Sequence, residues 1–256
     1  MLYVVTAVHN RRAVTERFLA GLNAQRGCEW RLVLVDDGST DGTAEMVRRA
    51  CPTAEILPGD GRLWWAGAMQ LACEWLWNHA ENSDSVLLTN DDVRWPGDYL
   101  ATGMRHLWEN EGALISGIGV DERSGRWVDL PIRWSFAEAR GRSISDLAQR
   151  GNCASTRSLF CRMSDMRRIG GFHPRLLPHH LSDYAWTINA CRRGYAIWAF
   201  DDLRYGMEAP SPRRRGLRDV FGRGSYANPV HRLNFLLMVT PARQLPSALW
   251  SQLRRL

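Results

Sequence analysis

Short apolar runs alternate with longer amphipathic segments along the first 120 residues of the chain. The runs are rich in Val, Leu and Ile, as buried strands are, whereas the segments between them repeat their apolar positions with a helical period. In residues 12–25, for example, Val14, Phe18 and Leu22 fall on one helical face. We predict strands over residues 3–8, 31–35, 55–57, 85–88 and 113–120, and helices over residues 12–25, 43–50, 66–79 and 96–110. This alternation indicates βαβ units and therefore an α/β fold, with a Rossmann-like, mostly parallel central sheet flanked by helices.

The apolar pattern is less regular after residue 120. Residues 121–150 hold aromatic side chains among Arg and Gly without a firm period, so the pattern predicts no definite element there. Further on, it predicts strands over residues 158–163 and 196–200 and helices over residues 164–169 and 182–193. Gly194 stands just past the last of these helices, where glycine commonly ends a helix.

The composition is that of an ordinary globular protein. Of the 256 residues, 45% are apolar and 23% charged, and no apolar run approaches the roughly 20 residues of a membrane-spanning helix. The chain starts directly in a predicted strand, without the basic and apolar regions of a secretory leader, so we expect a cytoplasmic protein. Its six cysteines are dispersed and include no Cys-x-x-Cys pair, which argues against a zinc ribbon or a disulfide framework.

The positive charge is concentrated at the C-terminal end. The net charge is +6, and all 33 basic residues are arginine. Residues 213–256 contain nine arginines and one acidic residue, whereas residues 1–212 carry a net charge of −2. One helix face in this basic segment is predicted from the spacing of Leu245, Leu249, Trp250 and Leu253. The segment suits binding to an anionic membrane surface, such as the inner face of the plasma membrane. Alternatively, it packs against the rest of the chain or against a second copy of the chain, as in a homodimer.

Two acidic pairs follow predicted strands. Asn90, Asp91 and Asp92 come directly after one strand, and Asp36 and Asp37 come directly after another. The carboxyl ends of parallel strands meet at one edge of a sheet, which is where open α/β sheets bind ligands. Carboxylates at that edge suit Mg²⁺ or Mn²⁺, which neutralise a diphosphate. Taken alone, each pair can also be explained as a turn or a helix cap.

A loop rich in glycine and tryptophan precedes the predicted helix at 66–79. Glycines let the backbone approach a ligand closely, and Arg62 can reach a phosphate, so we select Asp60 and Arg62 as candidate ligand-binding residues. The adjacent Trp64 and Trp65 are further candidates, because an indole ring can stack on a sugar or a base. Ordinary core packing is the alternative for one of the two.

Five segments occur in an order that is more specific than any one of them. They are residues 4–11 (VVTAVHNR), 32–43 (LVLVDDGSTDGT), 90–92 (NDD), 170–172 (GGF) with 182–184 (SDY), and 193–195 (RGY). Together they resemble the family 2 nucleotide-sugar glycosyltransferases, of the kind that builds bacterial surface glycans. The resemblance extends over roughly residues 3 to 200, most of the chain.

The resemblance implies a GT-A fold, a divalent cation (Mg²⁺ or Mn²⁺), a nucleotide-diphosphate sugar donor of the UDP or dTDP type, and an inverting single displacement. Asp92 would be the metal ligand, and Asp183 would be the general base that deprotonates the acceptor hydroxyl. The metal would stabilise the diphosphate leaving group. Transferred position by position, Thr6, Ala7 and His9 would line the donor pocket, Asp36 or Asp37 would face the nucleobase, and Asn90 and Asp91 would also contact the donor. With a donor and an acceptor implied, we assign Asp60, Arg62 and Trp65 to the donor and Trp64 to the acceptor.

The chain departs from the family's pattern at three points. The first acidic residue of the metal-binding element is replaced by Asn90, and the acidic residue before the base is replaced by Ser182. Where the family often has a histidine ligand, this chain has Glu208, which is our candidate for a second metal ligand. His180, one of two adjacent histidines shortly before the base, is a candidate for acceptor binding, and at most one of the pair is expected to be functional.

We therefore predict a catalytic domain over residues 1–212, with a nucleotide-sugar part over about 1–120 and an acceptor part over about 121–212, followed by a basic amphipathic segment at 213–256. The enzyme would transfer a hexose or deoxyhexose to a hydroxyl of a surface polysaccharide or of its lipid-linked precursor. A sugar-phosphate nucleotidyltransferase is one alternative, although the chain has no lysine for a phosphate clamp. A non-catalytic basic protein that binds nucleic acid is the other, but no helix-turn-helix or RNP-like pattern supports it, so no nucleic-acid partner is expected.

Overall fold

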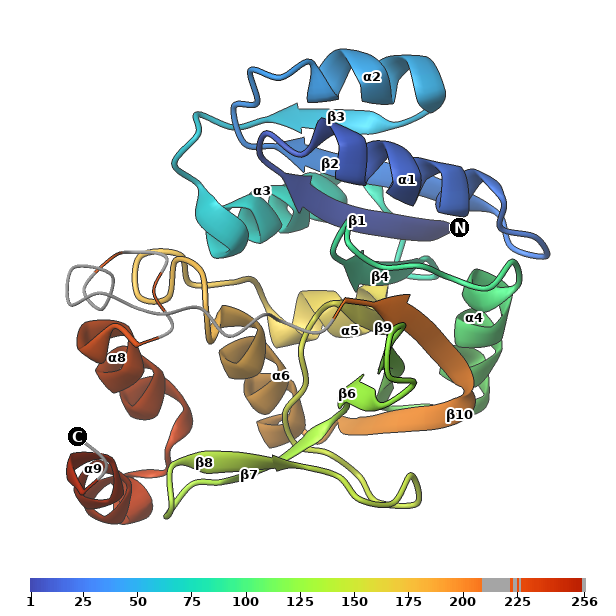
Figure 1. Ribbon diagram of the computed structural model, residues 1–256. Helices are drawn as coiled ribbons and strands as arrows, with labels where there is room; N and C mark the ends of the chain where they lie inside the picture. The colour runs from blue at the N-terminus through green and yellow to red at the C-terminus, as the bar shows by residue number, and fades with distance from the viewer. Residues whose placement is uncertain (209–221, 223–224, 226, 255–256) are drawn as a thin grey trace.

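A sheet with the strand order β10-β5-β9-β4-β1-β2-β3 forms the centre of the computed structural model, which describes residues 1–208, 222, 225 and 227–254 (Figure 1). β6 pairs with β5 outside this path. β1 to β5 and β10 run in one direction, and β9 and β6 run against them. The predicted, mostly parallel sheet is confirmed. Its strands are β1 (Leu2–Val8), β2 (Trp30–Asp36), β3 (Glu55–Pro58), β4 (Ser85–Thr89), β5 (Ala113–Asp121), β6 (Trp127–Asp129), β9 (Ser158–Arg162) and β10 (Ala196–Met207).

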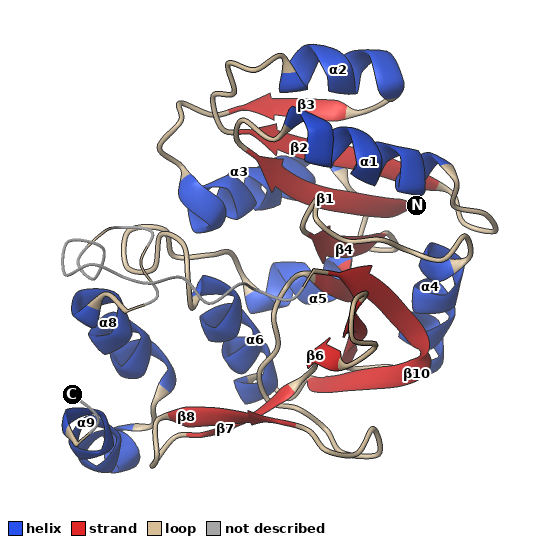
Figure 2. Ribbon diagram, in the orientation of Figure 1, coloured by secondary structure: helices blue, strands red, loops and turns tan. Residues whose placement is uncertain are grey.

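Helices cover both faces of the sheet (Figure 2). On one face, apolar side chains of α1 (Arg12–Asn23), α2 (Thr43–Ala50) and α4 (Tyr99–Glu109) pack on the strands. On the other, α3 (Trp64–His79), α5 (Met163–Ile169) and α6 (Ser182–Arg192) do so. Both faces of the central strands are therefore buried, which explains why β2 and β4 read as continuous apolar runs in the sequence.

The C-terminal helices pack on the protein. α8 (Pro229–Val239) and α9 (Leu245–Leu253), joined by a 3₁₀ turn (Ala242–Gln244), lie beside α6 and the hairpin of β7 (Ile132–Ser135) and β8 (Arg140–Ser143). Phe235, Leu236 and Val239 of α8 share an apolar cluster with residues of α6. Leu249 also packs against this cluster, but Trp250 and Leu253 are exposed, so the predicted face of α9 is divided between core and surface. Of the nine arginines of the basic segment, Arg232, Arg243 and Arg254 are described, and the others lie outside the described residues.

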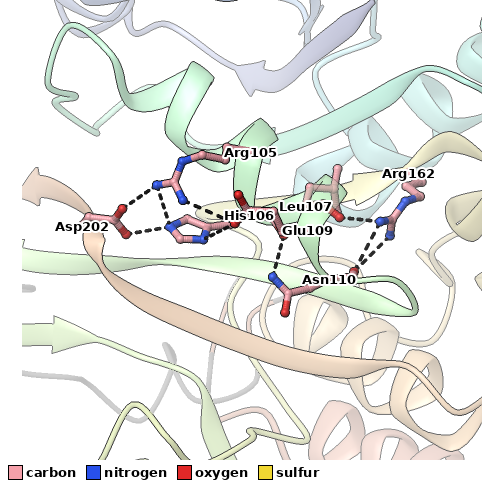
Figure 3. A network of polar contacts seen from close by, with 7 residues as sticks. All are labelled: Arg105, His106, Leu107, Glu109, Asn110, Arg162 and Asp202. Carbon is pink, nitrogen blue, oxygen red and sulfur yellow. Dashed lines mark hydrogen bonds and ion pairs between the residues drawn. The ribbon is translucent and has the colours of Figure 1, made fainter.

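A polar network joins α4 to β9 and β10, away from the carboxyl end of β4 (Figure 3). Asp202 accepts hydrogen bonds from His106 Nε2 and Arg105 Nη2, each at 2.6 Å. Asp202 lies where β10 changes register against β5, between Ala199 and Arg204. Arg162 of β9 donates to the carbonyl oxygen of Leu107 in the same helix. These contacts hold α4 against β9 and against β10 at the point where the register of β10 changes.

Three features of the fold go beyond the sequence pattern. β9 inserts antiparallel between β4 and β5, and β10 continues past the predicted residue 200 to Met207. The region without a period, residues 121–150, contains the three short strands β6, β7 and β8. Across the described part of the chain, the helices are all too short or too polar to cross a bilayer.

Candidate active site

The carboxyl ends of β1, β2 and β4 meet at one edge of the sheet. β1 and β2 pair in register as far as Val8 and Asp36, and β4 runs parallel on the other side of β1. The residues that follow these strands, His9, Asp37 and Asn90, therefore project from the same edge. This is the position at which open α/β sheets bind ligands.

A cavity of about 360 Å³ opens beside this edge. It brings together four residues that the sequence assigned to the donor and one assigned to the acceptor, and it adds His179. Burial lowers the pKa of His179, so its ring is neutral at pH 7. The ring centroid of His179 lies 5.6 Å from that of Trp64 in an edge-on arrangement. The lining residues are Ala7, Val8, His9, Asp37, Gly61, Trp64, Trp65, Ala68 and His179.

The Asp37 carboxylate holds one wall of this cavity in place. Its Oδ1 accepts hydrogen bonds from the backbone N–H groups of Gly61, at 2.8 Å, and Leu63, at 3.3 Å, and its Oδ2 accepts from that of Trp64 at 3.1 Å. His9 Nδ1 lies 2.5 Å from the Asp37 carbonyl oxygen. Asp37 thus anchors the glycine- and tryptophan-rich loop at the start of α3, as a cap does.

Other predicted donor residues lie away from the cavity lining. Thr6 is completely buried, and its hydroxyl has no hydrogen-bond partner within the described structure. Asp36 is buried, and its Oδ1 accepts a hydrogen bond from the Ser39 N–H at 3.0 Å. Asp60 and Arg62 are exposed and bonded to each other through the Arg62 N–H. Their roles stay predictions, and in this conformation Thr6 does not reach the cavity.

Left-handed backbone conformations flank the candidate site. Asn10, Trp64 and Leu181 have φ values of 52°, 57° and 68°, which are unfavourable for residues with a side chain. They adjoin His9, the aromatic wall of the cavity and the start of α6. Such residues persist only where the surrounding structure holds them, and they cluster at functional sites. Trp64 is held by its N–H bond to Asp37.

The two adjacent carboxylates after β4 have different surroundings. Asp91 is buried and accepts hydrogen bonds from Arg11 Nε and from Thr15 Oγ1, the latter at 2.9 Å. Burial raises the pKa of Asp91, and Arg11 opposes that rise. The Asp92 side chain is 44% exposed, and its only ion pair with a described residue is a 3.8 Å contact with Arg11. The Asp91 carboxylate is therefore used in bonds to Arg11 and Thr15, whereas the Asp92 carboxylate is available to a ligand.

Asp92 and Glu208 line one cavity of about 430 Å³, so the two predicted metal ligands lie on the same opening. Within the described parts of the chain, no three His, Cys, Asp or Glu side chains are grouped closely enough to hold a metal ion by themselves. The available donors are carboxylate oxygens, which fit Mg²⁺ or Mn²⁺. An ion held by one or two carboxylates would complete its shell with phosphate and water oxygens, as Mg²⁺ commonly does.

Comparison with known sequences decides the family. The family profile described as "Glycosyl transferase family 2" matches residues 3–168, more than half of the chain. The chain belongs to glycosyltransferase family 2. The enzyme is therefore a glycosyltransferase, as the sequence predicted.

A relative with an assigned activity is the N-acetylglucosaminyl-diphospho-decaprenol L-rhamnosyltransferase of Mycobacterium tuberculosis. It is 30% identical to this glycosyltransferase over 122 residues, which are 44% of this chain and 40% of the relative. The match thus spans less than half of the relative's length.

Solved structures show the same fold. The mannosyltransferase PcManGT from Pyrobaculum calidifontis, in complex with GDP-Man and Mn²⁺, superposes with a TM-score of 0.62 at 19% identity, over 99% of this chain and 74% of that one. GalNAc-T7 with UDP, GalNAc and Mn²⁺ gives a TM-score of 0.64 at 11% identity, over 82% and 43%. Staphylococcus aureus TarS gives 0.59 at 19% identity, over 81% and 36%. The predicted GT-A fold is confirmed.

Asp183 lies in the first turn of α6 and is partly buried. Burial raises the pKa of its carboxyl to about 6; the neighbouring Asp129 adds to the rise, while the Tyr184 N–H, at 2.8 Å from Oδ1, and Arg157 oppose it. The carboxylate of this glycosyltransferase is therefore mostly ionised at neutral pH but more basic than a free aspartate, which suits a general base.

The structure adds three residues that the sequence analysis did not select. Asp129, on β6, accepts hydrogen bonds on Oδ2 from Ser155 Oγ at 2.6 Å and Tyr205 OH at 2.7 Å. Arg157 precedes β9, and His179 lines the cavity while its neighbour His180 is exposed. No local signal marks Asp129 or Arg157, because each reaches the site through long-range strand pairing. Which histidine faces the cavity depends on one turn of the backbone.

Proposed function

We propose that this glycosyltransferase is a metal-dependent, inverting enzyme that moves a sugar from a nucleotide-diphosphate donor to a hydroxyl of a lipid-linked glycan precursor or surface polysaccharide. The observation that supports the proposal is that an exposed carboxylate, Asp92, and a carboxyl with a raised pKa, Asp183, both interact electrostatically with the same side chain, Arg157. An aromatic cavity opens at the carboxyl ends of β1 and β2. These are the parts that glycosyl transfer needs: a base, a leaving-group site and a nucleoside pocket.

The cavity beside β1 suits the nucleoside of the donor. Trp64, Trp65 and His179 supply aromatic surface for stacking, and Asp37 fixes the loop that carries the two tryptophans. The opposite end of the edge, at Asp92 and Glu208, suits the diphosphate. A divalent ion bound there would neutralise the charge that develops on the leaving diphosphate. UDP and dTDP are the nucleotides we propose.

Asp183 supports the inverting mechanism. Its carboxylate would accept the proton of the acceptor hydroxyl as that oxygen attacks the sugar carbon from the face opposite the diphosphate. Asp129 is the other carboxylate close enough to raise the pKa of Asp183. Because Asp129 is already hydrogen-bonded to Ser155 and Tyr205, it is poorly placed to act as a nucleophile for a double displacement.

The acceptor proposal draws on the relative and on the surface of the C-terminal helices. The relative is named as an N-acetylglucosaminyl-diphospho-decaprenol L-rhamnosyltransferase, and its lipid-linked acceptor favours an acceptor of the same kind here. Val230, Leu233 and Leu237 form an exposed apolar stripe on one face of α8, and Trp250 and Leu253 are exposed on α9. We propose that this surface contacts the inner face of the plasma membrane, with residues 213–256 acting as the contact segment of the 1–212 catalytic domain. A homodimer that buries the stripe is the competing outcome.

An activity screen tests the proposal. Purified full-length enzyme would be incubated with UDP-, dTDP- and GDP-sugars and a prenyl-diphosphate-linked N-acetylglucosamine, with Mn²⁺ or with EDTA. We expect product with one donor, in the presence of the ion, and an anomeric configuration opposite to that of the donor by NMR. Retention of configuration, or equal turnover in EDTA, would overturn the mechanism.

A further inference from the structure

Arg157 is fixed at the edge of the sheet that carries Asp92. β9 runs antiparallel to β4, with Ser158 opposite Thr89, so the residue just before β9 lies beside the segment that follows β4. The carbonyl oxygen of Arg157 accepts hydrogen bonds from Thr89 Oγ1, at 2.8 Å, and from the Asn90 N–H, at 3.4 Å. The backbone of Arg157 is therefore held against the element that contains Asp92.

The guanidinium of Arg157 has few partners for a group in this position. Its Nε is buried and has no hydrogen-bond partner within the described structure, and its Nη1 contacts the weak acceptor Sδ of Met207 at 3.3 Å. Burial lowers the pKa of Arg157, but the negative charges of Asp92 and Asp129 raise it by more. The pKa is therefore raised overall, and the guanidinium is positively charged. None of the described carboxylates is close enough to form an ion pair with it.

Neighbouring arginines differ in this respect. Arg11 is bound to Asp91 at 2.9 Å, and Arg94 is bound to Glu122 at 2.6 Å. Arg157 alone, among these three, forms no ion pair with a described carboxylate. A half-buried cation with an unsatisfied donor is costly unless an anion binds it. A guanidinium matches the geometry of phosphate oxygens and can bind two of them at once.

We propose that Arg157 is an anion-binding residue whose guanidinium binds a phosphate oxygen of the donor diphosphate beside Asp92. This inference rests on the proposed function, because the diphosphate ligand is part of that proposal. A phosphate of a lipid-linked acceptor has the same chemistry, but the backbone contacts of Arg157 with Thr89 and Asn90 place it on the donor side. The chain contains no lysine, so a side-chain cation for this purpose must be an arginine.

Calorimetry on full-length protein tests the inference. UDP, dTDP and GDP, the matching nucleosides, and geranyl diphosphate as a soluble prenyl diphosphate would be titrated in Mg²⁺ buffer into the wild type, Arg157→Gln and Arg157→Lys. Arg48→Gln removes the same charge from the exposed surface of α2 and is the control. We expect Arg157→Gln to weaken diphosphate binding by about 10- to 100-fold and to leave nucleoside binding within about twofold, since one charged hydrogen-bonding group is lost. Arg157→Lys should recover part of the loss, and it carries the test if Arg157→Gln does not fold.

The outcomes separate the two levels of the proposal. Absence of binding by the wild type to all three nucleoside diphosphates would defeat the proposed function itself. Wild-type binding with unchanged affinity in both Arg157 variants would overturn this inference and leave the function intact. An equal loss for nucleosides would show that Arg157 only supports the cavity wall. A loss for geranyl diphosphate alone would move Arg157 to the acceptor.

Discussion

We assign Asp37 and Asp183 to different ends of the candidate site, and the two carboxyl groups differ in how the protein satisfies their hydrogen-bonding capacity. Both oxygens of Asp37 accept backbone hydrogen bonds, three in all, at the end that we assign to the nucleoside. The carboxyl group of Asp183, at the end that we assign to transfer, accepts one hydrogen bond within the described part of the chain, from the Tyr184 N–H, and its pKa is raised to about 6. Arg157 and Asp92 at the same end are also incompletely paired.

This difference in hydrogen bonding distinguishes residues that stabilise the structure of the site from residues that are free to bind a ligand. A carboxylate whose lone pairs are filled by backbone donors stabilises a loop, and it has little capacity left for a substrate. A carboxylate or guanidinium left incompletely paired lowers the stability of the free protein and gains partners when the substrate binds. Substitutions of Asp37 and of Asp183 should therefore have opposite effects on stability.

The largest effect is expected for Asp183→Asn. Asparagine cannot accept the acceptor proton, so the transfer rate should fall by about 1,000-fold or more, while donor affinity by calorimetry stays within a few-fold. Because the folded-state pKa is raised, folding favours the protonated form. Ionisation of Asp183 therefore lowers stability as pH rises above the unfolded-state value of 3.8, and the full loss is reached above about pH 6. The variant should therefore be more stable than wild type at pH 7.5, by about 1–3 kcal/mol. Loss of donor binding would instead place Asp183 in the donor site.

The raised pKa of Asp183 also determines the pH dependence that we expect for the transfer rate of the wild type. Transfer should decline as pH falls through about 6, because protonated Asp183 cannot act as a base. The measurement is kcat/KM from pH 5 to pH 8 with donor and metal ion saturating. A profile without a change of slope in this range would contradict the assignment.

Asp92→Asn and Asp91→Ala form a pair of variants on adjacent residues. Asp92→Asn should lower activity by about 100-fold and remove most of its dependence on a divalent ion, with little change in melting temperature, since the side chain is exposed. Asp91→Ala should instead lower stability by about 1–3 kcal/mol, because Arg11 and Thr15 lose a buried acceptor. Turnover against Mn²⁺ concentration and thermal melts measure the two effects. Wild-type turnover in Asp92→Asn would leave that residue as a turn former only.

Asp37→Ala tests the structural end of the comparison. Three backbone N–H groups would lose their acceptor, so stability should fall by about 1–3 kcal/mol and donor affinity by about 10-fold as the tryptophan loop loosens. Denaturant melts and calorimetry report these changes. An unchanged melt with abolished donor binding would show that Asp37 binds the nucleobase directly.

The smallest effect concerns the membrane. The stripe on α8 should be tested by Leu233→Glu and Leu237→Glu, since both side chains are exposed, whereas deleting the segment would remove Phe235 and Leu236 from the core. We expect co-sedimentation with anionic liposomes to fall by a few-fold in each variant. Unchanged sedimentation together with a change from dimer to monomer would assign the stripe to self-association.

The sequence predicted local elements well and long-range placement poorly. The helix over 43–50 has the predicted bounds, because its apolar period and flanking turn are local signals. The antiparallel insertion of β9 between β4 and β5 depends on distant pairing, and it is what carries Arg157 to the edge of the sheet. Residues 121–150 gave no period because their short strands are mostly exposed and face different neighbours.

Within the candidate site, residue type was more predictable than side-chain role. Acidic residues after β2 and β4 were expected from the pattern, but the pattern does not tell Asp91 from Asp92. The rotation of the backbone in one turn points Asp91 at Arg11 and Thr15 and leaves Asp92 exposed. The same limit applies to His179 and His180, of which His179 lines the cavity.

Calorimetry of nucleotide-sugar binding, with and without a divalent ion, tests the account most directly. Wild-type protein and Asp92→Asn would be titrated with UDP-, dTDP- and GDP-sugars in Mn²⁺ and in EDTA. We predict that at least one nucleotide-sugar binds the wild type about 10-fold or more tightly in Mn²⁺ than in EDTA, and that Asp92→Asn loses this difference. If none of these donors binds, or if the wild-type affinity is the same in Mn²⁺ and in EDTA, the assignment of this edge of the sheet to a metal-bound donor diphosphate is wrong.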